Sequence, residues 1–389
     1  MKRLTFEHQC RLERRRLRIE DKRRRRRVRS ARNFIRPAGK HRVQPIGMRV
    51  RWQAGKKKGW IRAATRISMP RKLCLETNYE ETAECLMGVR SRLINTLQTA
   101  QENGTVPQRY PSGIMPSFWD FTEIEHCSPS AALIIAAEYD RVRHFYRWFI
   151  PVIELDRWNP GLLAMLDGVG FFKLLGIARP TYRSPNPNMT ILPFRTGSSV
   201  GQSEASEIVH SLSLSDDRSE TIDEPTLRFG ALVEATENTC HHAYTDIGDP
   251  FTVKQWWMTG AIDRSTSFLN LVVFDQGLTI PATLSSWPRY PWVAKGLRRL
   301  RRIWPDRLDH EFDADRLRLA MDAPRSSTGE THRGKGFPAF RDVLDESRNG
   351  NLRIISRRGE LYQEKGKRAR GRVLKTPLQG TLIEWNLWL

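Results

Sequence analysis

Apolar residues recur along the chain at two different spacings, and each spacing predicts one kind of element. In residues 82–100 and 131–145 they lie three and four positions apart, which is the period of a helix. Residues 151–155, 190–194 and 269–274 are short apolar runs of strand length, and the last, LNLVVF, predicts a buried strand. Because helices and strands alternate, the pattern predicts the α/β fold class.

Turn and capping residues set the expected limits of these elements. The sequence Ser-Pro-Ser at 128–130 predicts the start of the second helix, and Asn-Pro-Gly at 159–161 predicts the start of a third. Residues 181–189, rich in Pro, Ser and Asn, predict a linker. The sequence Arg-Arg-Gly at 357–359 lies between two strand-like runs and so predicts a hairpin turn.

The positive charge of the protein is concentrated at one end. Residues 1–72 hold 27 Lys and Arg but only 4 Asp and Glu, a net charge of +23, whereas the whole chain carries +22. Such a dense run of like charge with few apolar residues predicts a disordered basic arm without a packed core. Trp52 and Trp60 stand among its basic residues, which suits stacking on nucleic-acid bases. A solvated tail is an alternative of equal weight, and an anionic membrane surface is a third.

Length and cysteine content narrow the class of protein. A chain of 389 residues with 39% hydrophobic residues is long enough for two domains of ordinary size. Its apolar stretches are too short to form a transmembrane segment, and no apolar segment follows the N-terminal charges as in a signal peptide. Five scattered cysteines without a C-x-x-C spacing favour a cytoplasmic location and predict neither a disulfide framework nor a zinc site.

The segment Phe229–Tyr244 (FGALVEATENTCHHAY) carries the most informative polar side chains. Glu234, Asn238 and His242 lie four residues apart and so share one stripe of a predicted helix. An Asn oxygen can bind Mg²⁺, and a Glu one turn away can orient or deprotonate a water. His241 and His242 could suggest a metal, but adjacent side chains point in different directions on a helix, so we expect structural roles for them.

Three later segments add groups suited to a nucleotide. The apolar run at 269–274 ends in Asp275-Gln276-Gly277, where a carboxylate at a sheet edge can hold a ring amino group, although an ordinary turn has the same sequence. The sequence Gln-Gly-Thr at 379–381 opens a last predicted strand. Between them, glycines before a helix predicted at 338–344 offer backbone amides to phosphates. The residues of this phosphate segment are Thr328, Gly329, Arg333, Gly334, Lys335 and Gly336.

Together these four segments resemble the N, G1, G2 and G3 boxes of the GHKL superfamily, which includes gyrase, Hsp90, histidine kinases and MutL. The first box, Glu-Ala-Thr-Glu-Asn followed by His-Ala-Tyr, is most similar to that of anti-sigma-factor serine kinases, which are bacterial signalling proteins. The resemblance implies a Bergerat α/β sandwich with a mixed sheet over residues 190–389, and ATP and Mg²⁺ as cofactors. It implies the following roles: Glu234 as general base, Asn238 as Mg²⁺ ligand, Asp275 and Gly277 at adenine with Thr381 in support, and His242 and the phosphate segment at the nucleotide.

Two features depart from the family pattern. The G1 box has Thr279 where the family has its second glycine, which predicts an altered contact with adenine. Residues 281–325 are also long for a connection between these boxes. In the superfamily such a segment is the ATP lid, which becomes ordered around nucleotide. An insertion with packing of its own is the alternative.

Residues 73–180 resemble a STAS domain, the fold of the anti-anti-sigma factors. The elements that carry the likeness are Asp120 after a strand, Ser128 and Ser130 before an apolar helix, and the terminal sequence GFFKLL at 170–175. Where the family has Asp-Ser-Ser-Gly, this chain has His-Cys-Ser-Pro-Ser. Ser128 is therefore a candidate phosphorylation site whose more ordinary role is that of a helix N-cap.

Three functional hypotheses follow. The first is an ATPase or a serine/threonine kinase-like enzyme that regulates its STAS-like part or another protein partner. The second is an ATP-sensing switch without turnover. The third is nucleic-acid binding through residues 1–72, which is compatible with the second. We also consider a homodimer. Fold resemblance by itself does not select among these hypotheses.

Overall fold

The computed structural model describes residues 43–45, 49–104, 114–146, 150–213, 223–245, 250–286, 290–323 and 336–388. The chain divides between Gly39 and Lys40, and every described residue lies in the unit Lys40–Leu389. This unit combines helices with mixed and antiparallel sheets, so the predicted α/β class is confirmed at that level. Among the described residues, no helix is long and apolar enough to cross a membrane.

The larger sheet has the strand order β12-β13-β11-β10-β8, with β9 also paired to β10, and these strands pair antiparallel. Its strands are β8 (Met189–Ile191), β9 (Arg195–Gly197), β10 (Trp256–Asp263), β11 (Phe268–Asp275), β12 (Asn349–Glu364) and β13 (Arg370–Trp388). Along β11, Leu271 and Val273 enter one hydrophobic core, whereas Val272 and Phe274 enter another. Burial on both faces explains why this strand is an unbroken apolar run.

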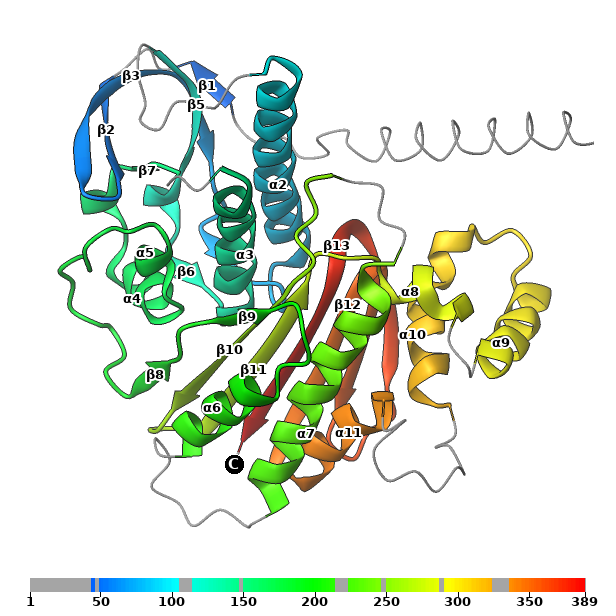
Figure 1. Cartoon of the computed structure of the whole chain (residues 1–389). Coiled ribbons are helices and arrows are strands. Elements are labelled where there is room, and N and C mark those ends of the chain that lie inside the picture. The colour runs from blue at the N-terminus through cyan, green and yellow to red at the C-terminus, as the bar shows by residue number, and fades with distance from the viewer. Residues whose placement is uncertain are drawn as a thin grey trace, which may run out of the picture. The chain divides into compact units, whose positions relative to one another are not determined.

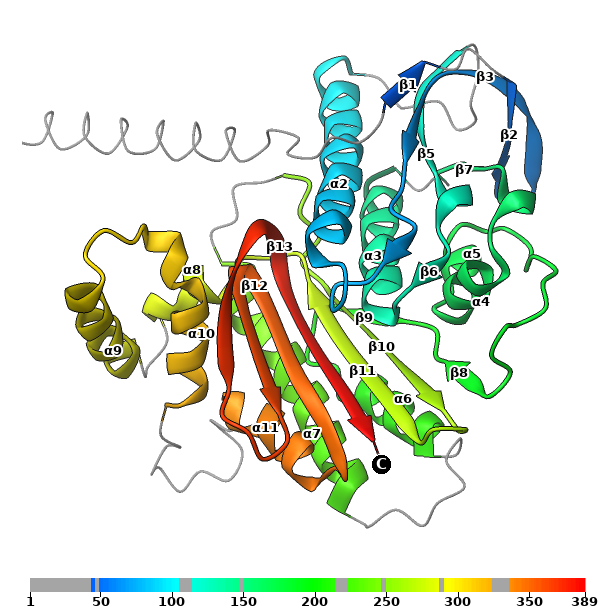
Figure 2. The same cartoon turned by 180° about the vertical axis from the view of Figure 1, so that it is seen from behind.

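Helices cover the two faces of this sheet (Figures 1 and 2). One face packs against α6 (Gln202–Ser213), α7 (Asp223–Asn238) and α11 (Gly336–Glu346). The opposite face packs against α2 (Tyr79–Glu102) and α3 (Pro129–Tyr146), which come from the N-terminal half of the chain. The helices predicted at 82–100, 131–145 and 338–344 are thereby confirmed. The domain limits 73–180, 181–189 and 190–389 stay predictions.

The smaller sheet lies in the N-terminal half and has the order β1-β3-β2-β7, with β5 parallel to β3. Its strands are β1 (Val43–Pro45), β2 (Arg49–Ala54), β3 (Lys57–Ser68), β5 (Ile114–Asp120) and β7 (Val152–Ile153). A separate parallel pair joins β4 (Lys72–Leu73) to β6 (His126–Cys127). The remaining short elements of this half are 3-10 turns at Phe121–Glu123 and Leu155–Arg157 and the helices α4 (Pro160–Gly168) and α5 (Phe171–Leu174).

The expectation that all of residues 1–72 lacks a packed core is wrong for residues 49–72. Strands β2 and β3 pair as an antiparallel hairpin, and its Val50, Ile61 and Ala63 are buried in a small core. The physical reason is a period of two in which apolar side chains alternate with Lys and Arg, so one face is buried while the charges lie outside. The net charge of residues 1–72 gives no indication of this alternation. Residues 1–42 lie outside the described part.

The capping predictions in the N-terminal half are confirmed. Asn159 precedes α4 and its Oδ1 accepts a hydrogen bond from the Gly161 amide at 2.7 Å. Ser128 precedes α3, and its Oγ accepts from the Ala131 amide at 3.3 Å while lying 3.1 Å from Ser130 Oγ. The N-cap role of Ser128 is therefore what the structure supports.

The predicted hairpin turn at 357–359 is wrong. Residues 349–364 form one continuous strand, β12, and the register shifts around Arg357 mark a bulge, with φ of 58° at that residue. The chain instead reverses after Glu364, where Gly366 has φ of 69°. A bulge and a turn use the same small set of residues, and only strand pairing distinguishes them.

The described residues between Ile280 and Met321, called the insertion below, form a small core of their own. The ATP lid and the family-specific insertion both stay predictions for this segment. Its elements are α8 (Ile280–Thr283), the 3-10 turns Leu284–Ser286 and Asp309–Phe312, α9 (Tyr290–Ile303) and α10 (Asp313–Met321). Val293 and Leu297 of α9 pack against Phe312 and Ala320, and α10 packs against β12 and β13.

Candidate functional site

The two polar residues predicted to serve the metal and the water lie next to each other on α7. Asn238 Nδ2 donates to Glu234 Oε1 at 3.1 Å and to the Glu234 carbonyl oxygen at 2.9 Å. Both side chains are half-buried, so they remain accessible from one side. The side-chain bond links the amide nitrogen of Asn238 to the carboxylate of Glu234. The amide oxygen of Asn238 takes no part in this bond, and an oxygen of this kind is what Mg²⁺ binds.

The end of α7 changes its hydrogen-bond pattern. Residues Thr239–Ala243 form a π-helical turn, a feature that is rare and is often found at functional sites. Burial lowers the pKa of His242, and His241 lowers it further, whereas Glu237 opposes the shift. His241 is exposed, with its Nε2 lying 3.8 Å from Glu237. In the described part of the chain no three His, Cys, Asp or Glu side chains cluster to hold a metal ion.

Asp275 lies at the end of β11 and is almost fully buried, with 6% of its surface exposed. Its Oδ1 accepts from the Gly277 amide at 2.8 Å, and it pairs across the sheet with Thr381 on β13. Burial raises the pKa of this carboxyl to about 7, although the Gly277 and Thr381 amides and Arg90 oppose the shift. A buried carboxyl with a raised pKa is a common feature of functional sites.

Glycines allow three of the four predicted segments to meet around Asp275. A Cβ on Gly277 would overlap the carbonyl oxygen of Ala243, at the end of the π-helical turn. A Cβ on Gly380, where φ is +91°, would overlap the carbonyl oxygen of Asp275. The Leu278 amide also donates to the Ala243 carbonyl at 2.5 Å. The first, second and fourth segments are thus brought together, and only glycine fits at the two contact points.

Thr279 has an ordinary backbone conformation at the position where the family pattern has glycine. Its φ is −80° and its ψ is 152°, a region open to any residue. Its carbonyl oxygen accepts from the Ala282 amide at 2.8 Å as α8 begins. The Cβ of Thr279 therefore introduces no backbone strain.

Most of the phosphate segment lies outside the described residues. This holds for Thr328, Gly329, Arg333, Gly334 and Lys335. Gly336 begins α11, which packs along α7, so the helix that follows the third segment lies beside the helix of the first.

Sequence reasoning missed two hydroxyls beside this site. Ser356 Oγ lies 2.9 Å from Thr381 Oγ1 and accepts from the Ile280 amide at 2.8 Å. The Tyr244 hydroxyl accepts from the Gln276 amide at 3.1 Å and donates to the Gln255 carbonyl. Tyr244 stood in the first predicted segment, but Ser356 gave no signal because its position depends on the pairing of β12 with β13.

A buried polar network joins this site to the helices on the other face of the sheet. Gln276 Nε2 donates to Glu138 Oε1 at 3.0 Å, and Glu138 on α3 is fully buried. Glu138 forms ion pairs with Arg90 of α2 and with Arg141, each at 3.2 Å. The only sequence signal was that Glu138 directly follows the apolar run of residues 131–137 in this helix. The loop that follows Asp275 is thereby attached directly to α3.

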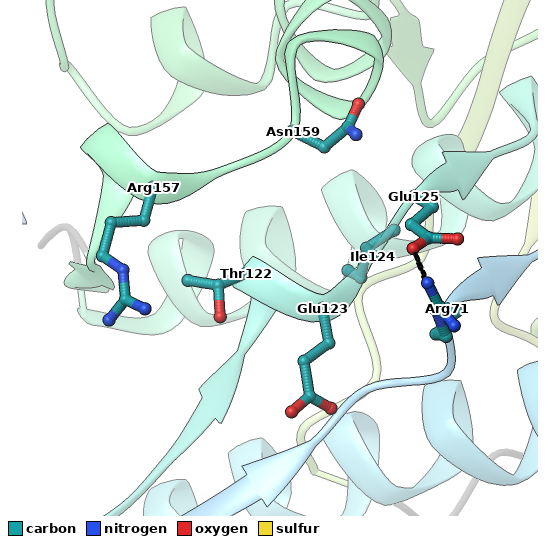
Figure 3. A pocket seen from close by; sticks show the side chains of 7 residues that line it. All are labelled: Arg71, Thr122, Glu123, Ile124, Glu125, Arg157 and Asn159. Atoms are coloured by element: carbon teal, nitrogen blue, oxygen red, sulfur yellow. Dashed lines mark hydrogen bonds and ion pairs between the residues drawn. The ribbon is translucent and has the colours of Figure 1, made fainter.

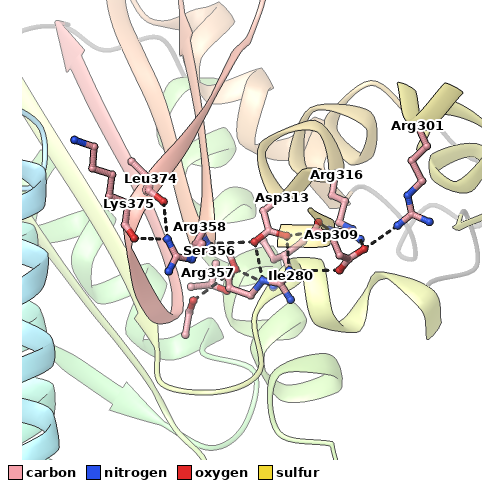
Figure 4. A network of polar contacts seen from close by, with 12 residues as sticks. Ile280, Arg301, Asp309, Asp313, Arg316, Ser356, Arg357, Arg358, Leu374 and Lys375 are labelled. Atoms are coloured by element: carbon pink, nitrogen blue, oxygen red, sulfur yellow. Dashed lines mark hydrogen bonds and ion pairs between the residues drawn. The ribbon is translucent and has the colours of Figure 1, made fainter. Parts of the chain in front are cut away.

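A second polar network attaches the insertion to the bulge in β12 (Figure 4). Asp313, fully buried at the start of α10, accepts from Arg357 Nε at 2.6 Å and from Arg316 Nη1 at 3.0 Å. Asp309 accepts from Arg301 at 2.7 Å and from Arg316. Arg357 directly follows Ser356 in β12. The insertion is therefore attached next to the residue whose hydroxyl contacts Thr381 beside Asp275.

One cavity, of ≈ 530 Å³, lies elsewhere in the N-terminal half (Figure 3). Its lining residues are Arg71, Thr122, Glu123, Ile124, Glu125, Arg157 and Asn159. Arg71 Nε donates to Glu125 Oε1 at 2.9 Å, so these two charged residues of the cavity lining form an ion pair. None of the residues predicted from sequence to carry chemistry lines this cavity, and we assign it no role in the site.

Comparison with known proteins adds no family assignment: no protein-family model matches the chain, and no curated protein matches it.

Proposed function

We propose that residues 190–389 bind Mg-ATP in the manner of the GHKL superfamily, and that the site hydrolyses ATP or transfers its phosphoryl group to a protein partner. In this proposal Asp275 accepts the adenine amino group, Asn238 binds Mg²⁺ and Glu234 acts on the attacking water or hydroxyl. Arg333, Gly334, Lys335 and Gly336 contact the phosphates.

The observation that carries the proposal is the environment of Asp275. Ionising a carboxyl group this deeply buried normally destabilises the folded protein, unless hydrogen-bond donors compensate for the buried charge. The Gly277 and Thr381 amides already favour the ionised form, and an adenine amino group is a further donor that suits this carboxylate. The close contacts at Gly277 and Gly380 hold the carboxylate at the sheet edge. The Glu234–Asn238 pair lies on α7, and the π-helical turn that follows α7 contacts Gly277.

Calorimetric titration with Mg-ATP, together with a phosphate-release assay, tests the proposal. Glu234→Gln should keep nucleotide binding but lose about 10²–10⁴-fold in turnover, because an amide cannot take a proton. Asn238→Ala should lose the magnesium-dependent part of the affinity. Glu237→Gln is the matched control, a neighbouring carboxylate on the same helix, and it should behave like the wild type. A wild-type protein that binds no nucleotide would refute the proposal.

The same assay separates the enzyme from the switch. Turnover that Glu234→Gln removes would identify an enzyme. Binding without turnover in the wild type would instead favour an ATP-sensing switch, in which the Gln276–Glu138 contact links the nucleotide loop to α3. Affinity should also rise as pH increases from about 6 to 8, because accepting the amino-group hydrogen bond favours the ionised form of Asp275.

Nucleic-acid binding is a second candidate function, and the outer face of the β2–β3 hairpin favours it. Arg49 and Arg62 lie directly opposite each other, a like-charge pairing that costs stability unless an anion covers it. Trp60 is 55% exposed on the same face, and the Arg49 guanidinium carbon lies 5.4 Å from its ring centre. Exposed aromatic rings beside cations suit the bases and phosphates of a single strand.

Fluorescence anisotropy with a labelled single-stranded oligonucleotide, measured over a series of salt concentrations, tests this second function. Trp60→Ala should weaken binding about 5- to 100-fold through lost stacking. Arg62→Gln should also reduce the salt dependence by about one charge. Arg370→Gln, an exposed arginine on the other sheet, is the control. Equal losses in Arg62→Gln and Arg370→Gln, with none in Trp60→Ala, would show that only net charge matters.

A further inference from the structure

The exposed side of α9 combines two properties that are uncommon on a protein surface. Trp292, Lys295, Arg299, Arg302 and Ile303 are all exposed, and at ~100° per residue they fall within about one third of the helix circumference. The opposite side of α9 is occupied, since Val293 and Leu297 are buried in the core of the insertion. This exposed sector therefore has no packing role within the insertion.

The apolar residues of this surface are large. Trp292 is 47% exposed, Ile303 is 55% exposed and Trp304, directly after the helix, is 46% exposed. Leu308, in the loop that follows, is 61% exposed. These are four of the seven large apolar side chains most exposed in the described residues. Such a concentration indicates an interaction site.

The charge of the surface is positive and uncompensated. Within the described part of the chain, no ion pair is formed by Lys295, Arg298, Arg299 or Arg302. The neighbouring Arg301, by contrast, pairs with Asp309 on the insertion side of the helix. The exposed sector thus presents cations between tryptophans at its two ends.

We infer that α9 docks the protein on an anionic lipid surface, with Lys295, Arg299 and Arg302 at the phosphate headgroups and Trp292, Ile303, Trp304 and Leu308 in the boundary layer below. Charge complementarity selects an anionic partner. The aliphatic side chains then select a bilayer over a nucleic acid, because Ile303 and Leu308 gain from hydrocarbon but find no partner along a phosphate backbone. Tryptophan at both ends also matches the preference of this residue for the membrane interface.

Sedimentation of the full-length protein with vesicles tests the inference. Vesicles of phosphatidylcholine alone are compared with vesicles that contain phosphatidylglycerol, at low salt and at 0.5 M salt. We expect binding to the anionic vesicles, and part of that binding should survive high salt because apolar insertion is not screened. Basic residues elsewhere in the chain bind electrostatically and should release at high salt, so the salt-resistant fraction reports on α9.

Two double variants and a control identify the surface. Trp292→Ser with Ile303→Ser keeps the net charge and should abolish the salt-resistant fraction. Arg299→Gln with Arg302→Gln should lower the partition coefficient about 25-fold, at roughly fivefold per cation. Arg368→Gln with Arg370→Gln removes the same charge from the β12–β13 end and should have little effect.

The outcomes that overturn the inference are also defined. An unchanged salt-resistant fraction in the serine variant would exclude α9 as the docking element. The inference also fails if the wild type binds neutral and anionic vesicles equally. Equal losses in the two glutamine variants would attribute binding to net charge. If the serine variant instead loses binding to a single-stranded oligonucleotide, the surface belongs to nucleic acid. This test does not depend on ATP, so its failure leaves the proposed nucleotide site unaffected.

Discussion

Replacing Asp275 by Asn should change how the stability of the protein depends on pH. Asn has the same shape and can still accept from the Gly277 amide, but it does not ionise. The folded protein holds the pKa of Asp275 at about 7, chiefly because burial disfavours its charged form. In the unfolded chain the same group has its ordinary pKa near 3.8. The folded state therefore binds a proton more tightly than the unfolded state does.

The magnitude follows from this difference. Well below pH 3.8 the carboxyl is protonated in both states, and its contribution to stability is fully present. That contribution is lost as pH rises through about 7, and a pKa difference of about 3 corresponds to about 4 kcal/mol. Between pH 4 and pH 8 the difference in unfolding free energy should therefore shift by about 4 kcal/mol in favour of the Asn variant.

Urea denaturation of both proteins at several pH values, followed by tryptophan fluorescence, measures this shift. Asp263→Asn is the matched control. It replaces a carboxylate at the end of the adjacent strand β10 whose pKa is lowered, first by the Ser265 hydroxyl. That variant should retain the loss of stability between pH 4 and pH 8. If the difference between wild type and Asp275→Asn does not change with pH, Asp275 is ionised throughout and our description of its environment is wrong.

Three further substitutions test the packing around the site. Gly380→Ala should destabilise by about 2–4 kcal/mol, because its φ of +91° and a backbone oxygen leave no room for a Cβ; an unchanged melting temperature would contradict this. Gly230→Ala should stabilise by about 0.5–1 kcal/mol, since it lies within α7 with nothing near the new methyl group; thermal denaturation checks the sign. Glu138→Ala should cost about 3–5 kcal/mol in a denaturant titration, because it leaves Arg90 and Arg141 buried without their anion, and a cost below about 1 kcal/mol would show that water reaches them.

Periodic patterns predicted the regular elements well. The apolar periods at 82–100 and 131–145 lie within α2 and α3, and LNLVVF forms β11. These signals are local, because each element must bury a face whose spacing is set by its own geometry. Capping at Asn159 and Ser128 is local for the same reason.

Two errors show where local signals fail. The hairpin at 357–359 was assigned from Gly and Arg between apolar runs, but the pairing of β12 with β13 continues past a bulge. The basic segment 49–72 was assigned from its charge, whereas its alternation of charged and apolar residues produces β2 and β3. In each case the deciding factor is the partner strand, which lies far away in the sequence.

For this protein, the sequence by itself determined the α/β class, the positions of most helices and strands, and the residues Glu234, Asn238, Asp275 and Thr381 as candidates for one site. Only the tertiary structure decided that Asp275 is buried against Thr381, that Gly277 and Gly380 bring the segments into contact, and that Ser356 and Glu138 adjoin them. The reason is physical. Periodicity reports which face of an element is buried, whereas the pKa of a carboxyl and the fit of a glycine depend on atoms contributed by elements distant in the chain.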